Sequence, residues 1–351
     1  MKRVLVTGGS GFIGSHTCLT LLEKGYEVLV IDSLINSSIK SLERVCEISN
    51  MAGKLNKEKL YFIKGDLRNK ELLQKIFFQS KENGRPISAV IHFAGLKAVN
   101  ESLEFPLKYW DINVNGTINL LEAMHKNKCR KIVFSSSATI YEKSSDSIID
   151  EEAKNNPTNP YGSTKFVVEK LLNDVFQSMP DEWRIVNLRY FNPIGAHPSG
   201  LIGESPIGMP SNIFPCITQV AANKLDYLKV YGNDWPTIDG TCIRDFIHIM
   251  DLAEGHIAAL EFLGNNQSQI MNFNLGTGIG TSVMQLLRTF QDVNNIKIPY
   301  KFMSRRKGDI PKVISDNSKA IKTLNWKPKR DLEQMCKDGW KWQLLNQEGY
   351  D

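Results

Sequence analysis

A glycine-rich turn near the start of the chain constrains the fold more than any other feature. A short apolar run, residues 3–7, stops at the sequence G-G-S-G-F-I-G and continues as a helical pattern. This order of strand, turn and helix is typical of a parallel α/β unit. Glycines leave room for a pyrophosphate to approach the backbone, and the helix directs its amide groups and dipole toward the anion. The turn therefore predicts a dinucleotide site that includes Gly8, Gly11, Phe12, Ile13 and Gly14.

A carboxylate at the end of the next strand indicates which dinucleotide is bound. The strand E-V-L-V-I ends in Asp32, about twenty residues after the glycine turn, where a carboxylate can accept both adenosine ribose hydroxyls. Such a carboxylate repels a 2′-phosphate, and neither Ser33 nor Leu34 is an arginine that could bind one. We therefore predict NAD as the cofactor.

Strands and helices alternate through the first half of the chain. Residues 60–63, 87–92 and 131–137 resemble strands, and residues 71–79 and 114–125 resemble helices. This alternation predicts an α/β fold with a Rossmann-type, doubly wound parallel sheet, whose sites lie at the carboxyl ends of the strands. Gly95, Ser137, Tyr161 and the glycine turn should meet at that edge, and Asp66 and Leu67 are placed to border the adenine.

A tyrosine and a lysine four residues apart offer acid/base chemistry at the same edge. Pro160 suits the first turn of a helix, so Tyr161 and Lys165 fall on one helix face. A phenol with an ordinary pKa of about 10 is a poor base at neutral pH, but a nearby cation favours its ionised form. The pair alone is common on solvated helices, so its meaning depends on the cofactor site in the same chain.

Composition narrows the class of protein. The 351 residues are 42% hydrophobic and 23% charged, as in ordinary soluble globular proteins, and the net charge of +5 is dispersed, so nucleic-acid binding is not expected. The first apolar run is too short for a signal peptide or a membrane span. Six widely spaced cysteines suit reduced thiols in the cytoplasm, and the scattered histidines and cysteines predict no metal site.

Several longer motifs occur together and in a specific order. They are G-G-S-G-F-I-G, H-F-A-G-L-K-A-V, F-S-S-S-A-T-I-Y, P-Y-G-S-T-K, L-R-Y-F-N-P-I-G-A-H-P-S-G and R-D-F-I-H-I-M-D-L-A. With them the chain resembles the extended short-chain dehydrogenase/reductase family, and within it the branch that epimerises UDP-sugars at C4. The similarity runs from residue 2 to the W-K-W-Q segment near the carboxyl terminus.

The resemblance implies a function and a set of site residues. The function is NAD-dependent, reversible epimerisation of UDP-glucose and UDP-galactose through a 4-keto intermediate, an isomerase activity of galactose metabolism. The implied catalytic residues are Ser137, Tyr161 and Lys165, with Lys165 lowering the tyrosine pKa. The implied cofactor-binding set adds Asn36, Asp66, Leu67, Phe93, Ala94, Gly95, Lys97 and Phe191. The implied substrate-binding set is Lys97, Ser137, Tyr161, Asn192, Asn212, Tyr231, Arg244, Arg306, Asp309 and Val313.

The resemblance also predicts the domain organisation and assembly. We expect an NAD-binding domain over residues 1–190, to which 233–263 return, and a smaller, loop-rich UDP-sugar-binding domain over 191–232 and 264–351. The predicted partners are small-molecule UDP-sugars, with neither nucleic acid nor membrane. A homodimer is expected through helices around 100–125 and 161–178.

The chain departs from the family pattern at two positions. Glu142 stands where a glycine usually follows A-T-x-Y, which bears on the loop to Pro157. Val313 replaces a bulky tyrosine found in members confined to UDP-glucose and UDP-galactose. A smaller side chain leaves room for a 2-acetamido group, so N-acetylated UDP-sugars are candidate substrates; alternatively, neighbouring side chains fill the gap.

Two other classes of function are open to the same sequence. A sugar-nucleotide dehydratase or decarboxylase begins with the same oxidation at C4. A dehydratase commonly needs an Asp-Glu pair beside the catalytic hydroxyl, whereas this chain has Ala138 and Thr139 after Ser137. A catalytically silent NAD-binding regulator is also compatible with the fold, although the intact Ser137, Tyr161 and Lys165 favour an enzyme.

Overall fold

The computed structural model describes residues 2–51, 59–142, 148–208, 210–306 and 308–350. Contacts divide the chain into two compact units. Unit 1 comprises 1–142, 154–189 and 253–273, and unit 2 comprises 143–153, 190–252 and 274–351. The expected boundaries differ from this division, because only residues 253–273 of the predicted returning segment group with unit 1. Residues 143–153, which were expected in the first domain, group with unit 2.

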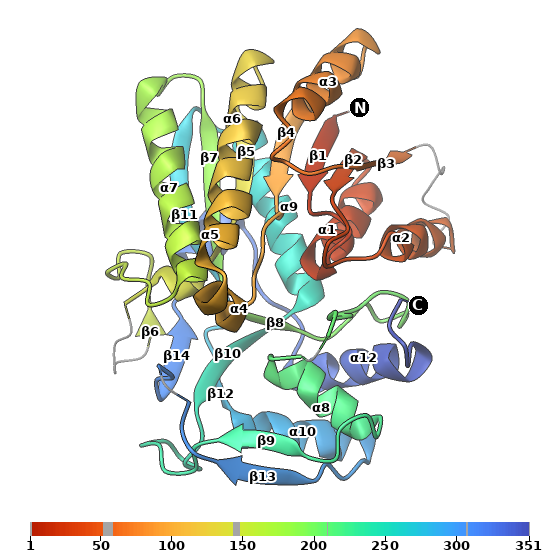
Figure 1. The fold of residues 1–351 in the computed structure, drawn as a ribbon, viewed down its shortest axis with the longest axis vertical. Helices are drawn as coiled ribbons and strands as arrows, with labels where there is room; N and C mark the ends of the chain where they lie inside the picture. The colour runs from red at the N-terminus through yellow and green to blue at the C-terminus, as the bar shows by residue number, and fades with distance from the viewer. Residues whose placement is uncertain (1, 52–58, 143–147, 209, 307, 351) are drawn as a thin grey trace. The chain divides into compact units, whose positions relative to one another are not determined.

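A seven-stranded sheet forms the centre of unit 1, and helices lie beside its strands (Figure 1). The strand order is β11-β7-β5-β4-β1-β2-β3, and the pairs from β5 through β4, β1 and β2 to β3 are parallel. The strands are β1 Arg3–Thr7, β2 Glu27–Asp32, β3 Leu60–Lys64, β4 Ile87–His92, β5 Lys131–Ser137, β7 Arg184–Tyr190 and β11 Gln269–Leu275. This sheet confirms the predicted fold class.

The helices of unit 1 follow their strands as the alternation predicted. They are α1 Phe12–Glu23, α2 Lys40–Met51, α3 Lys70–Glu82, α4 Val99–Glu104, α5 Pro106–Tyr109, the π-helix η2 Trp110–Asn115, α6 Gly116–Lys126, the 3₁₀ turn η3 Ala138–Ile140, α7 Pro160–Ser178 and α9 Ile249–Asn265. Apolar side chains of α3, α6 and α7 form one core with alternate residues of the strands, such as Leu5, Leu29 and Ile132.

Unit 2 contains two smaller sheets and four helices among its described residues. One sheet has the order β12-β10-β14-β6, with β8 also paired to β10, and the other pairs β13 with β9. The strands are β6 Ile148–Ile149, β8 Asn192–Ile194, β9 Leu228–Tyr231, β10 Ile243–His248, β12 Gly280–Ser282, β13 Tyr300–Met303 and β14 Lys312–Ser315. The helices are α8 Ile213–Ala221, α10 Val283–Asn294, α11 Ser318–Leu324 and α12 Leu332–Leu345.

The sequence predicted the first unit more closely than the second. In unit 2, the glycine- and proline-rich residues from 197 to 212 form turns and bends where they are described, as expected. Of the regular structure that follows them, the sequence predicted the amphipathic helix over residues 250–263, which is α9. No helix in the described parts of the chain is both long and apolar enough to cross a bilayer.

Candidate active site

The glycine turn lies at the carboxyl end of β1. Gly8 has a φ of +70°, and a Cβ there would lie 2.7 Å from the Ala94 backbone nitrogen. A Cβ on Gly14 would lie 2.3 Å from the Gly8 carbonyl oxygen, so both glycines are required for packing. A Cβ on Gly11 would meet nothing closer than that same oxygen, at 3.4 Å. Since packing leaves space over Gly11, the open backbone and the first turn of α1 fit an approaching phosphate.

Asp32 ends β2 beside this turn and is buried. Its carboxylate accepts hydrogen bonds from the Ser10 amide at 3.0 Å, the Leu34 amide at 2.9 Å and the Ser37 hydroxyl at 3.0 Å. An ionised carboxylate offers about four acceptor positions, so the protein groups leave capacity for a ribose hydroxyl. Asn36 lies exposed in the same loop. The turn and Asp32 together fit the adenosine half of a dinucleotide.

The residues after β3 are held in place by the guanidinium group of Arg68. The Arg68 guanidinium lies 2.7 Å from the Asp66 carboxylate and 2.7 Å from that of Asp111, and its hydrogen bonds lower the pKa of both acids. Leu67 is buried against Gly116. Asp66 is therefore already bound to an arginine, and its contact with a cofactor stays a prediction.

The loop after β4 is fixed by a residue that the sequence did not single out. Asn113, in the π-helix η2, accepts the Leu96 amide at 2.8 Å and donates to the Leu96 carbonyl at 3.1 Å. Its amide also donates to Thr164 of α7 at 3.0 Å. The amides of Phe93 and Ala94 donate to the Thr7 carbonyl. These bonds set the loop that carries Gly95 and Lys97, and no local pattern around Asn113 indicates this role.

Tyr161 and Lys165 lie at the start of α7, as predicted. The Asn159 side chain accepts the Gly162 amide at 2.9 Å and caps the helix, and Pro160 occupies its first turn. The Lys165 ammonium donates to the Ser135 carbonyl at 2.7 Å and lies 6.0 Å from the centre of the Tyr161 ring. Burial lowers the pKa of Lys165 to about 8.

The electrostatic surroundings of Tyr161 differ from the sequence-based expectation. Burial raises the pKa of its phenol, and a hydrogen bond with Ser137 and the charge of Lys97 act in the opposite direction. The resemblance assigns the lowering of the phenol pKa to Lys165, whereas in the structure the groups that lower it are Ser137 and Lys97. Lys165 is held by the Ser135 carbonyl because that oxygen lies at the carboxyl end of β5, next to the helix.

Ser137 ends β5 and begins the turn η3. Its Oγ lies 3.2 Å from the Thr139 amide and 3.0 Å from the Thr139 hydroxyl. The neighbouring Ser136 donates a hydrogen bond to the carboxylate of Glu169, at 2.5 Å. Glu169 lies one helical turn beyond Lys165 on α7. Ser137 is among the site residues predicted from the sequence, whereas Thr139 and Glu169 are not.

A buried ion pair holds β5, α7 and β7 together beneath these groups. Glu169 binds the Arg189 guanidinium at 2.6 and 3.0 Å, and both side chains are almost completely buried. Arg189 also donates to the Tyr141 hydroxyl at 3.0 Å. Glu142, the first departure from the family pattern, accepts hydrogen bonds from Lys154 and Asn156. The Glu169–Arg189 ion pair thus fixes the backbone that carries the acid/base residues.

Unit 2 brings together most of the residues expected to hold UDP. Arg306 donates to Asp309 at 3.1 Å and lies over the Tyr231 ring, 4.7 Å from its centre. Arg244 lies 3.8 Å from Asp309 and pairs with Val313 across β10 and β14. We call these five residues the arginine cluster of unit 2.

Other predicted residues of unit 2 lie around this cluster or apart from it. Asn192 pairs with Phe246 of β10, and Phe191 is buried, with its amide bound to the Leu275 carbonyl. Asn212 is an exposed residue at the start of α8. Asp245, which is not among the predicted site residues, is fully buried and accepts hydrogen bonds from Thr277, Gly278 and Ser315, fixing β14 beside Arg244.

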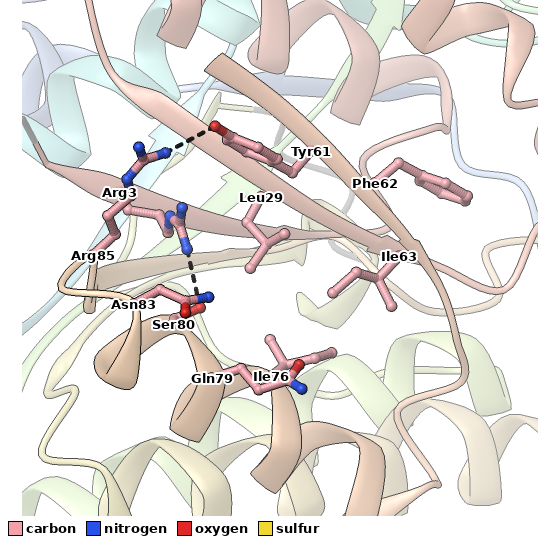
Figure 2. A pocket seen from close by; sticks show the side chains of 10 residues that line it. All are labelled: Arg3, Leu29, Tyr61, Phe62, Ile63, Ile76, Gln79, Ser80, Asn83 and Arg85. Atoms are coloured by element: carbon pink, nitrogen blue, oxygen red, sulfur yellow. Dashed lines mark hydrogen bonds between the residues drawn. The ribbon is translucent and has the colours of Figure 1, made fainter. Parts of the chain in front are cut away.

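A cavity of about 470 Å³ lies at the opposite, amino end of the strands in unit 1 (Figure 2). Its polar side chains are engaged with one another: Arg3 binds Glu27 and donates to Ser80 at 3.3 Å, and Arg85 donates to the Tyr61 hydroxyl at 3.0 Å. Its remaining walls are largely apolar, so the cavity offers no acid/base group near a cofactor site. No group of metal-binding side chains occurs among the described residues.

Comparisons with known proteins agree with this geometry. The family described as GDP-mannose 4,6 dehydratase matches residues 5–339. A UDP-glucose 4-epimerase of Bacillus subtilis is 49% identical over 99% of this chain and 98% of that protein.

Solved structures show the same fold over the full length. The epimerase of Stenotrophomonas maltophila, solved with bound NAD and formylated UDP-arabinopyranose, is 43% identical with a TM-score of 0.92, over 99% of both chains. That of Bifidobacterium longum, in complex with NAD⁺ and UDP, is 43% identical with a TM-score of 0.91, over 99% of this chain and 100% of that one. The chain belongs to the UDP-glucose 4-epimerase family of extended short-chain dehydrogenases/reductases.

Proposed function

We propose that the protein catalyses the NAD-dependent, reversible C4 epimerisation of UDP-glucose and UDP-galactose through a 4-keto intermediate. The observation that carries this proposal is the grouping of Ser137, Tyr161 and Lys165 at the carboxyl edge of the sheet that also bears the glycine turn and Asp32. An acid/base phenol beside a dinucleotide site suits the oxidation and reduction of a secondary alcohol.

Each residue of the catalytic group has a distinct role in this proposal. Tyr161 takes the proton of the sugar 4-hydroxyl as the ketone forms and returns it when the ketone is reduced. Ser137 hydrogen-bonds the reacting oxygen, and Lys97 favours the ionised phenol by its charge. Lys165 orients the cofactor ribose from its position on the Ser135 carbonyl. The net reaction inverts C4 without net oxidation of the sugar.

The glycine turn, Asp32 and the loop from Phe93 to Lys97 would hold NAD. The open backbone at Gly11 and the spare acceptor capacity of Asp32 fit its pyrophosphate and ribose. The carboxylate favours NAD over its 2′-phosphorylated form. When bound, NAD supplies the hydride acceptor and, after reduction, the hydride donor.

We assign the UDP part of the substrate to the arginine cluster of unit 2. Two guanidinium groups can each donate paired hydrogen bonds to a diphosphate, which favours arginine over lysine at such a site. Tyr231 offers an aromatic face for a base, with Arg306 already stacked against it. Because these residues would keep UDP bound, the 4-keto sugar would be free to turn and present its other face. Asn192 and Asn212 are further candidates for sugar or diphosphate contacts.

Val313 extends the proposal to N-acetylated UDP-sugars. It lies partly exposed on β14 opposite Arg244, and its side chain is much smaller than tyrosine. Changing Val313→Tyr should reduce conversion of UDP-N-acetylgalactosamine at least tenfold and leave that of UDP-galactose within about threefold, since one misplaced group costs roughly 1–3 kcal/mol. An unchanged ratio of the two activities would show that neighbouring residues already fill this space.

A homodimer in the cytoplasm completes the proposal. Helices α4, α5, η2 and α7 pack together, and the surface of α4–α6 exposes Val99, Leu103, Phe105, Leu107 and Ile118. Leu107 is 81% exposed, as suits a self-association surface. Changing Leu107→Lys should shift sedimentation toward the monomer, while a wild-type protein that is already monomeric would argue against the dimer.

The six cysteines form no disulfides, which suits a reducing compartment.

The decisive experiment uses purified protein without added NAD. Incubation with UDP-galactose should yield UDP-glucose at equilibrium, and extraction should release NAD. A 4-keto-6-deoxy product would favour the dehydratase, and loss of the 6-carboxylate from UDP-glucuronate would favour the decarboxylase. The absence of any product after NAD is added would favour the regulator.

A further inference from the structure

We propose that Thr139 is a positioning residue whose hydroxyl donates to Oγ of Ser137 and thereby directs the Ser137 proton to the phenol oxygen of Tyr161. This inference rests on the epimerase function proposed above. Thr139 lies in η3, partly buried, one residue beyond Ala138. It belongs to none of the groups predicted from the sequence.

The argument begins with the hydrogen-bonding capacity of Ser137. A serine hydroxyl carries one proton and two acceptor positions. The Thr139 amide, 3.2 Å from Oγ, fills one acceptor position, and the Thr139 hydroxyl at 3.0 Å is placed to fill the other. With both positions filled, Ser137 cannot accept a bond from the phenol. It can only donate its own proton, and we assign the phenol of Tyr161, whose pKa Ser137 lowers, as the acceptor.

Backbone packing fixes the turn against the helix that carries the phenol. A Cβ on Gly162 would lie 2.8 Å from the Thr139 carbonyl oxygen, so the two backbones are in close contact. The Asn159 cap holds the same turn of α7. Ser137 and Tyr161 therefore keep their relative positions, and the direction of one hydroxyl proton is the remaining variable.

The direction of this proton matters because it acts on the charge state of Tyr161. Lys97 from the loop after β4, Lys165 from α7 and Tyr109 from α5 are the titratable groups that face the phenol. A donated hydrogen bond from Ser137 favours the ionised phenol, whereas a bond accepted by Ser137 would favour the neutral form. Thr139 thereby adds to the effect of Lys97 against the burial that raises the phenol pKa.

The test replaces the Thr139 hydroxyl without changing its shape. Thr139→Val keeps the amide and removes the hydroxyl, and Thr139→Ser retains both donors. Thr20→Val is the matched control, because the Thr20 hydroxyl bonds only the His16 carbonyl of its own helix at 3.0 Å. We expect Thr139→Val to raise the apparent pKa of the acid limb of the kcat–pH profile by about one. The rate on that limb should then fall about tenfold and recover at higher pH. KM for UDP-galactose should stay within about twofold, and Thr139→Ser and Thr20→Val should behave as wild type.

A second readout does not depend on turnover. The ionisation of Tyr161 is followed by phenolate absorbance in each variant, with the same variant carrying Tyr161→Phe as the reference. Thr139→Val should raise the phenol pKa. A lowered pKa would show that Ser137 donates to Thr139, and an unchanged pKa would show that Thr139 has no influence; either result overturns the inference. Failure of the proposed function would instead appear as a wild-type protein that does not convert UDP-galactose.

Discussion

The two ends of the sheet in unit 1 use charged side chains in different ways. At the amino end, Arg3 and Glu27 neutralise each other beside a large cavity (Figure 2). At the carboxyl end, Lys165 is buried without a carboxylate partner among the described contacts, and its pKa falls to about 8. A perturbed, buried ionisable group beside a cofactor turn marks the reacting edge better than cavity volume does. The presence of a cavity at the amino end is therefore no reason to place the reacting groups there.

The largest expected effect is a loss of kcat when the phenol at the carboxyl end of the sheet is removed. Tyr161→Phe should lower kcat for UDP-galactose by about 10³-fold, because it removes the acid/base group and little else. Bound NAD, measured by extraction, should stay near the wild-type level. A variant that retained more than a tenth of wild-type activity would contradict the role of the phenol.

The next prediction compares the effects on stability of breaking two ion pairs of unit 1, Glu169–Arg189 and Arg3–Glu27. Glu169→Ala should lower the free energy of unfolding by about 3–5 kcal/mol, because Arg189 is left buried without its carboxylate. It should also lower kcat, since Ser136 loses its acceptor. Glu27→Ala, at the amino end, should destabilise the protein but leave kcat within about twofold. Urea unfolding and initial rates measure both quantities, and equal losses of kcat would remove the distinction between the ends.

A smaller effect concerns the burial of Lys165. Its pKa is about 8 in the folded protein, against an ordinary value of 10.5, so below pH 8 both states are protonated and the folded state bears the full desolvation penalty. Between these values the unfolded chain binds more protons, so this penalty disappears as pH rises. Lys165→Met should therefore stabilise the protein by about 1–3 kcal/mol at pH 7 while lowering activity, and the gain should vanish above about pH 10.5. Urea unfolding at both pH values checks this, and a variant less stable than wild type at pH 7 would contradict it.

The smallest effect tests the cavity at the amino end. The Arg85 side chain is 55% exposed and its ion pair with Glu27 is long, at 3.6 Å. Arg85→Gln should leave the urea midpoint and kcat indistinguishable from those of the wild type, as is usual for exposed pairs. A clear loss of epimerisation in this variant would mean that the cavity contributes to function.

The sequence predicted those features that depend on local patterns. The apolar runs and the glycine turn located β1, β2 and α1, and Pro160 located the start of α7. Asn113, Thr139 and Glu169 escaped prediction because their roles depend on which segments the fold brings together. The Asn113 side chain, for example, joins a loop 17 residues earlier to a helix 51 residues later.

The domain boundaries illustrate the same limit. The helical pattern near residue 250 predicted a return to the first domain, but the pattern does not reveal where along α9 the contacts change. In the structure the change falls between Leu252 and Ala253. The pairing of β11 with β7, which lies about a quarter of the chain earlier, is likewise a property of the folded sheet.

The position of β11 has a consequence for how the chain acquires its structure during synthesis. β11 pairs with β7, yet it is made only after the whole segment from Tyr190 to Leu252 has been added. Until then β7, an almost completely buried strand, has no neighbour on that side and presents open backbone groups. Since contacts of long sequence separation form slowly, the nascent first unit should pass through a period in which this edge is prone to association with other chains.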